Sequence, residues 1–174
     1  MGVRPRRLAA ALLALALLIG CTSRPQFDPR LGQVLPDIGL VIGVGQADGR
    51  EWTVGLSVET NLICQSLWLD GTRVGGAACS GLVAAATNNA VVSLTAGQAD
   101  MVAGLADPTI SSVEITTDHG SFMTPVVELS PIGLPGAAFG VYVPHGTKLG
   151  ELRFVDRHGE LVERQALPNT QVHP

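Results

Sequence analysis

This sequence of 174 residues has few charged side chains and very few aromatic ones. Charged residues make up 15% of the chain and aromatic residues 4%, and Lys148 is the only lysine. Nucleic acids and anionic lipid headgroups are bound by clustered Lys and Arg, so this composition argues against both as partners. Gly, Ala, Val, Leu and Thr dominate, and Gly and Pro are spread along the chain, which excludes a coiled coil and a disordered tail.

The sequence also lacks an apolar run long enough to form a permanent membrane span at its N-terminus. The run Leu8–Ile19 falls short of the ~20 residues that a bilayer-crossing helix needs. It follows Arg4-Pro5-Arg6-Arg7, and the two together have the layout of a secretory signal peptide. The paired arginines are compatible with twin-arginine export, but their flanking residues do not fit that signal, so we favour the general secretory route.

The end of this run, Leu18-Ile19-Gly20-Cys21, resembles the lipobox of bacterial lipoproteins. In that family a diacylglycerol is attached to the thiol of the Cys before the signal peptide is cut off. The resemblance implies that residues 1–20 are a signal peptide and that Cys21 is the lipidated first residue of a protein on the extracytoplasmic side of the cell membrane. Two or three acyl chains bind a membrane durably, whereas one binds marginally. The alternative is an ordinary signal peptide with a chance Cys.

Removal of residues 1–20 leaves 154 residues, which is enough for one domain. This mature part has 8 basic and 15 acidic residues, a formal charge of −7. Residues 22–36 contain three prolines and no apolar periodicity, which is typical of a semi-extended tether. We therefore predict a lipidated Cys and tether over 21–36, a folded domain over 37–167 and a C-terminal tail over 168–174.

The rest of the chain consists of short apolar segments separated by turns. Several segments alternate with the period of two that a half-buried strand requires, as in Trp52–Val58. The candidate strands are 39–44, 51–58, 62–69, 90–95, 99–105, 112–117, 122–129, 138–143, 151–155 and 160–167. Their spacing predicts an all-β fold, an antiparallel sandwich of seven or more strands. Only Ser80–Thr87 suits a two-turn helix.

The alternation also predicts which side chains fill the core of this sandwich. Residues of one phase should lie on the inner faces of their strands. They are Trp52, Val54, Leu56, Leu67, Val92, Val113, Ile115, Phe139, Val141 and Phe154.

The stretch from about residue 90 to 167 resembles the C-terminal modules of functionally uncharacterised secreted bacterial proteins. The residues that carry the resemblance are Gly104-Leu105-Ala106, Val113-Glu114-Ile115, Phe139–Pro144 and the turn Asp156–Gly159. The resemblance covers under half of the chain. It implies an immunoglobulin-like sandwich and implies no activity.

Two cysteines, Cys64 and Cys79, remain besides Cys21. Export places them in an oxidising compartment, so we expect a disulfide between them. It closes a loop of about 15 residues and stabilises the fold by around 3 kcal/mol in the chain-entropy estimate. The alternatives are two free thiols or a metal pair, but there is no Cys-x-x-Cys spacing.

No pattern in the sequence points to a catalytic, metal or cofactor site. His119, His145 and His158 lie in turns beside Gly, and His173 is next to the C-terminus, so no two share a strand or helix face at metal-ligand spacing. Ser80 lacks the Gly-x-Ser-x-Gly pattern of a hydrolase nucleophile. We therefore expect no cofactor and a non-enzymatic module that binds an envelope protein or a ligand. The rival hypothesis is a hydrolase or metal carrier whose site is assembled from distant loops.

Overall fold

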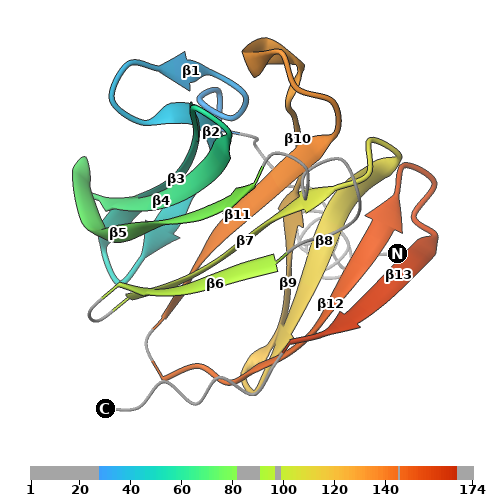
Figure 1. Ribbon diagram of the computed structural model, residues 1–174. Coiled ribbons are helices and arrows are strands. Elements are labelled where there is room, and N and C mark those ends of the chain that lie inside the picture. The colour runs from blue at the N-terminus through green and yellow to red at the C-terminus, as the bar shows by residue number, and fades with distance from the viewer. Residues whose placement is uncertain (1–27, 82–90, 97–98, 145, 168–174) are drawn as a thin grey trace, which may run out of the picture.

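The computed structural model describes residues 28–81, 91–96, 99–144 and 146–167, with residues 91–96, 99 and 100 described by their backbone alone. Within these ranges the chain forms strands and a single turn of 3₁₀ helix, Ser130–Ile132. None of the described residues belongs to a helix with the length and apolarity of a membrane span. The strands form three antiparallel sheets, here named A, B and C (Figure 1). The predicted all-β fold is confirmed.

Sheet A is a meander of the first five strands, each paired with the next. These strands are β1 Val34–Leu35, β2 Gly39–Ala47, β3 Arg50–Glu59, β4 Leu62–Leu69 and β5 Thr72–Gly81. Asp48-Gly49 and Asp70-Gly71 connect strands at two of its hairpins, and all four residues have positive φ. Two successive positive φ angles give the type I′ turn, whose twist matches that of the flanking strands.

Sheets B and C are built from the remaining strands, which enter the two sheets as alternate hairpins. Sheet B has the order β10-β11-β7-β6, and sheet C has the order β13-β12-β8-β9. Their bounds are β6 Val91–Ala96, β7 Ala99–Ala106, β8 Ile110–Thr117, β9 Gly120–Pro125, β10 Val127–Glu128, β11 Ala137–Pro144, β12 Leu149–Asp156 and β13 Leu161–Ala166. Lettered A to G in chain order, with β9 as C′, these strands give the sheets D-E-B-A and G-F-C-C′, which is the immunoglobulin arrangement.

Sheet B is the middle layer of the molecule, between sheets A and C (Figure 1). Strand β11 shows why: Phe139 meets Phe154 of sheet C edge to face, with ring centroids 5.9 Å apart. The next residue, Gly140, faces the other way, since a Cβ there would lie 2.8 Å from Cβ of Val54 in sheet A. Both faces of β11 are therefore buried, and the absence of a side chain at Gly140 lets sheet A approach closely.

The core predicted from the alternation is confirmed for every residue whose side chain is described. Nine of the ten predicted inner residues are 9% exposed or less, and the side chain of Val92 lies outside the described part. The sequence pattern was interpreted as one sandwich with a single interface. In the structure the core has two interfaces. Trp52 and Val54 pack between sheets A and B, whereas Phe139 and Phe154 pack between sheets B and C.

Three buried residues of sheet A are polar, namely Thr53, Gln65 and Ser66, and Gln65 is the most buried of them. Gln65 is 1% exposed, and its register partners are Leu56 and Ala78, so it lies on the face that packs against sheet B. Its Oε1 accepts no hydrogen bond from the described part of the chain. A buried amide oxygen without a donor costs about 1–3 kcal/mol.

The structure corrects the predicted helix at Ser80–Thr87 in its described part. Ser80 and Gly81 belong to β5, where they pair with Ile63 and Leu62, and residues 82–87 lie outside the described residues. β5 itself was not among the predicted strands, because Gly75-Gly76 breaks its alternation. In the structure the register between β4 and β5 shifts opposite Ser66, and Gly75 and Gly76 lie in this irregular part of β5.

The folded domain begins earlier than the sequence predicted. Residues 28–36, expected to form the end of the tether, lie against sheet A, where Val34 pairs with Leu40 and Leu35 with Gly39 in β1–β2. The amide N–H of Gly32 donates to the carbonyl of Val41 at 2.9 Å, which extends this pairing.

A candidate ligand cleft beside the N-terminal segment

The predicted disulfide between Cys64 and Cys79 is present. The two residues are register partners on β4 and β5, and their Cα atoms lie 4.1 Å apart. Cys64 is 1% exposed and Cys79 is exposed, so the bridge lies at the edge of sheet A. Cys21, the predicted lipidation site, lies outside the described residues.

The described histidines lie apart from one another in exposed turns. His119 is 77% exposed in its side chain, and its Nε2 lies 3.7 Å from a carboxylate oxygen of the adjacent Asp118. His158 is exposed in the β12–β13 turn, and His145 and His173 are outside the described residues. Ser80 lies on strand β5 next to the disulfide. Within the described ranges, no three His, Cys, Asp or Glu side chains come together as metal ligands.

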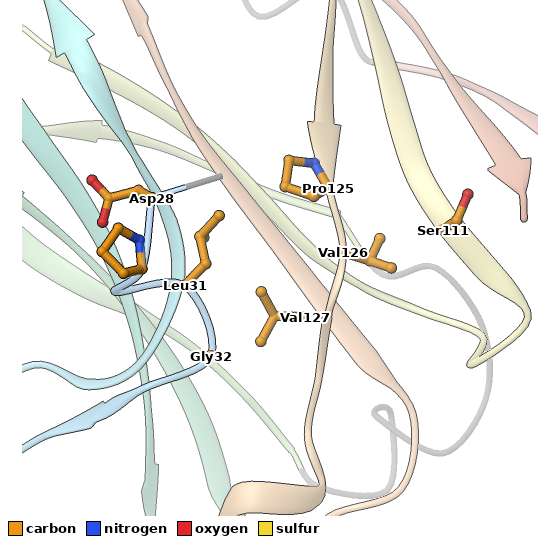
Figure 2. A pocket seen from close by; sticks show the side chains of 8 residues that line it. Asp28, Leu31, Gly32, Ser111, Pro125, Val126 and Val127 are labelled. Carbon is orange, nitrogen blue, oxygen red and sulfur yellow. The ribbon is translucent and has the colours of Figure 1, made fainter. Parts of the chain in front are cut away.

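A cleft opens where the first described residues pass the ends of sheets B and C. Its volume is about 460 Å³, which is within the usual range of ligand sites. The lining residues are Asp28, Pro29, Leu31, Gly32, Ser111, Pro125, Val126 and Val127. Figure 2 shows Asp28 and Leu31 on the N-terminal segment and Pro125 to Val127 opposite them, where the chain passes from β9 to β10, with Val126 pointing toward the side of Ser111.

The N-terminal wall of the cleft is fastened to sheet A by one arginine. Arg30 donates from Nε and Nη2 to both carboxylate oxygens of Asp28, at 2.9 and 2.8 Å, and from Nη1 to Glu51 of β3 at 2.6 Å. This bidentate pairing lowers the pKa of Asp28 to about 2. Gln33 adds a hydrogen bond from Nε2 to the carbonyl of Pro29 at 2.8 Å. The wall is therefore held rigidly although it contains no long strand.

The opposite wall is set by the crossing of the chain from sheet C to sheet B. β9 ends at Pro125 and β10 begins at Val127, so Val126 lies at the point where the chain changes sheet. The amide N–H of Val126 donates to the carbonyl of Ser111 at 3.2 Å, which fixes the crossing against β8. Proline has no amide N–H to give to a sheet, so Pro125 ends β9 at this point.

The polar groups of the cleft are already engaged by the protein. The Asp28 carboxylate is paired with Arg30, and the single hydroxyl hydrogen of Ser111 is engaged by the carbonyls of Asp156 at 2.7 Å and Val155 at 3.2 Å. Neither group lies beside a histidine among the described residues that line the cleft. The remaining lining side chains are apolar, so the arrangement suits contact with an uncharged, mainly apolar ligand.

Sequence reasoning did not find this cleft. Its N-terminal wall was assigned to the tether, and its other wall lies between two strands that the sequence reads as one segment, 122–129. The single available signal was Pro125 inside that segment, because proline interrupts a central strand. No protein-family model matches the chain, and neither a curated protein nor a solved structure is significantly similar to it.

Proposed function

We propose that this protein is a lipoprotein held on the extracytoplasmic side of the cell membrane by lipid on Cys21, and that it is a binding module. The cleft between Leu31 and Val127 is its ligand site. The observation that supports this function best is the chemistry of the lining side chains, which are apolar apart from a carboxylate and a hydroxyl that the protein already engages. These side chains offer contact to an apolar ligand, and the backbone between them offers polar groups that can orient it.

The position of the cleft along the chain links it to the proposed anchor. Asp28 lines the cleft and is seven residues after Cys21. Seven fully extended residues span at most about 25 Å, so the lipid holds the cleft within that distance of the membrane surface. The ligand is therefore a molecule or chain segment present at the surface of the envelope.

The anchor is tested by Cys21→Ser in the producing cell. We expect a precursor that is neither lipidated nor cut, because the thiol is the acceptor of the lipid and lipidation precedes cleavage in the lipoprotein family. Mass spectrometry of the wild-type membrane fraction should find an acylated N-terminal Cys21. An unmodified N-terminus at that residue contradicts the proposal.

The cleft is tested by Val126→Asp in an exported soluble form that starts after Cys21, with Nile red as an uncharged apolar probe. Circular dichroism first checks that the form is folded. Val126 lines the cleft, and a carboxylate facing an apolar ligand costs about 1–3 kcal/mol, so saturable binding should weaken about tenfold.

The matched control is Val162→Asp, because Val162 is 55% exposed on β13 and does not line the cleft. It should leave the binding of Nile red unchanged. Equal losses in the two variants, or no saturable binding by the wild type, refute the cleft as the ligand site.

A further inference from the structure

Sheet C has one face that no described strand covers. Its inner face packs against sheet B through residues such as Val113 and Phe154, both 0% exposed. The side chains of the opposite phase along β8 and β12 point away from the core. Figure 1 shows sheet C as an outer layer, with sheet B on its other side. We call the exposed side of the sheet the outer face of sheet C.

Four register partners form one row across this outer face. Met123 of β9 pairs with Glu114 of β8, which pairs with Arg153 of β12, which pairs with Arg164 of β13. Nη1 of Arg153 donates to Glu114 at 2.8 Å, with side chains 33% and 22% exposed. Met123 is 63% exposed, more than any other large apolar side chain among the described residues. The row therefore reads apolar, acidic, basic and basic across the sheet.

A second row of register partners lies next to this one on the same face. Pro125 pairs with Ser112, which pairs with Val155, and Val155 pairs with Leu161 just after a register shift between β12 and β13. Leu161 is 40% exposed, and Val155 is partly exposed. This row is mainly apolar, so the outer face combines an apolar stripe with a charged one.

We propose that the outer face of sheet C docks against the same face of a second copy of this chain. The two-fold axis lies in the interface between the two copies. It runs parallel to the strands, above the space between β8 and β12. Rotation about this axis places Glu114 opposite Arg153 of the second copy, and Arg153 opposite its Glu114. Met123 then lies opposite Arg164 of the second copy, where the aliphatic part of the arginine covers the exposed thioether side chain.

The charges of the row select a second copy over an unrelated partner. The order of the row is complementary to itself when reversed, since the acidic residue of each copy meets a basic residue of the other. Arg153 has five N–H donors: Nη1 donates to Glu114 and Nε lies 3.7 Å from a carboxylate oxygen of Glu151, so the donors of Nη2 remain for a second carboxylate. The second row is also self-complementary, because Pro125 meets Leu161 and Ser112 meets Val155.

The size of the face sets the strength of the dimer. Four strands about 4.8 Å apart, two of eight residues and two of six at about 3.3 Å each, give roughly 450 Å² per copy, or about 900 Å² in total. This is below the usual size of specific, stable protein interfaces, so the dimer is weak and concentration-dependent. The side chains of Glu114 and Arg153 are partly exposed, so salt weakens the dimer further.

The test compares Met123→Arg with Met123→Glu in the full-length protein, by sedimentation equilibrium in density-matched detergent. Within one chain, residue 123 faces Glu114, so arginine is favourable there and glutamate unfavourable. Across the proposed interface residue 123 faces Arg164 of the second copy, so arginine is unfavourable there and glutamate favourable. Each change acts at two symmetric contacts, each worth about 0.2–1 kcal/mol, so we expect dissociation constants to change roughly two- to thirtyfold. Met123→Arg should weaken the dimer and Met123→Glu should retain or strengthen it.

The control is Val58→Arg, because Val58 is 41% exposed at the far end of sheet A. It should leave self-association unchanged. A wild-type protein that remains monomeric at every attainable concentration overturns the proposal. So does a pair of Met123 variants that shift the dissociation constant in the same direction, since that result reflects the fold and not the interface.

Discussion

The closest approach between sheets A and B provides the sharpest test of the three-layer arrangement. Gly43 of β2 lies against Gly140 of β11, and a Cβ built on Gly43 would lie 2.7 Å from the carbonyl carbon of Gly140. Ordinary van der Waals contact begins at about 3.4 Å. The obstacle is backbone in a strand that is buried on both faces, so it cannot move aside as a flexible side chain can. Gly43→Ala therefore forces the two sheets apart.

The cost of this change follows from the packing. Extra methyl groups in a well-packed core cost typically 1–3 kcal/mol, and an obstacle made of backbone places Gly43→Ala near the upper end, at about 3 kcal/mol. With a urea m-value of about 2 kcal/mol per M, the unfolding midpoint should fall by about 1.5 M. The melting temperature should fall by about 6–12 °C for a domain of this size. Urea unfolding followed by circular dichroism measures the first quantity and thermal melting the second.

The matched control is Gly76→Ala on β5. Gly76 has no atom within 4 Å of an added Cβ and no positive φ, so alanine fits without strain. The smaller entropy of the unfolded chain should then stabilise this variant by up to about 1 kcal/mol. If Gly43→Ala is as stable as this control, sheets A and B do not cross at Gly43 and Gly140, and the three-layer arrangement is refuted.

Three further predictions concern individual interactions. Replacing both Cys64 and Cys79 with Ala should lower the free energy of unfolding by about 3 kcal/mol, and non-reducing peptide mapping of the native protein should find the two joined; freely alkylatable thiols contradict this. Gln65→Met should raise the free energy of unfolding by about 1–2 kcal/mol in urea titrations, because it removes the unbonded amide oxygen at similar volume; a loss of stability means that the amide has a partner. Pairing with Arg30 lowers the pKa of Asp28 from 3.8 to about 2, so its stabilising effect is present above about pH 4 and is lost as the pH falls toward 2. Thermal melts across that range should therefore show wild type and Asp28→Asn converging at low pH, and a constant gap between them refutes the pairing.

The local patterns of the sequence determined the strands and their turns. Ten short apolar segments between turns, several of them alternating, were predicted as strands, and strands are present in all ten. Asp48-Gly49 and Asp70-Gly71 form tight turns, because Asp and Gly are among the few residues that adopt two successive positive φ angles. The disulfide partners also followed from counting, since Cys64 and Cys79 are the two cysteines left after Cys21. The immunoglobulin-like module was predicted over about the same residues that form sheets B and C.

Only the tertiary structure decided that the sheets stack in three layers. In β11 the alternation of Phe139, Gly140 and Val141 was interpreted as buried residues alternating with an exposed one. In the structure large residues alternate with a small one, and both faces of the strand are covered. A pattern of period two cannot distinguish these cases, because small residues suit an open face and a close contact between sheets equally well. The presence of a second packed sheet is a long-range property that no local window contains.

The cleft depends on the same long-range contacts. Its walls come from Asp28–Gly32 and from Pro125–Val127, which are about a hundred residues apart in the chain and carry no shared pattern. The sequence of the N-terminal segment, with its prolines and few apolar residues, favours an extended tether. Arg30 overrides that preference, because its ion pairs with Asp28 and Glu51 tie the segment to β3. The sequence by itself determines the elements and the proposed anchor, and tertiary packing determines where a ligand can bind, because packing alone brings distant apolar side chains together.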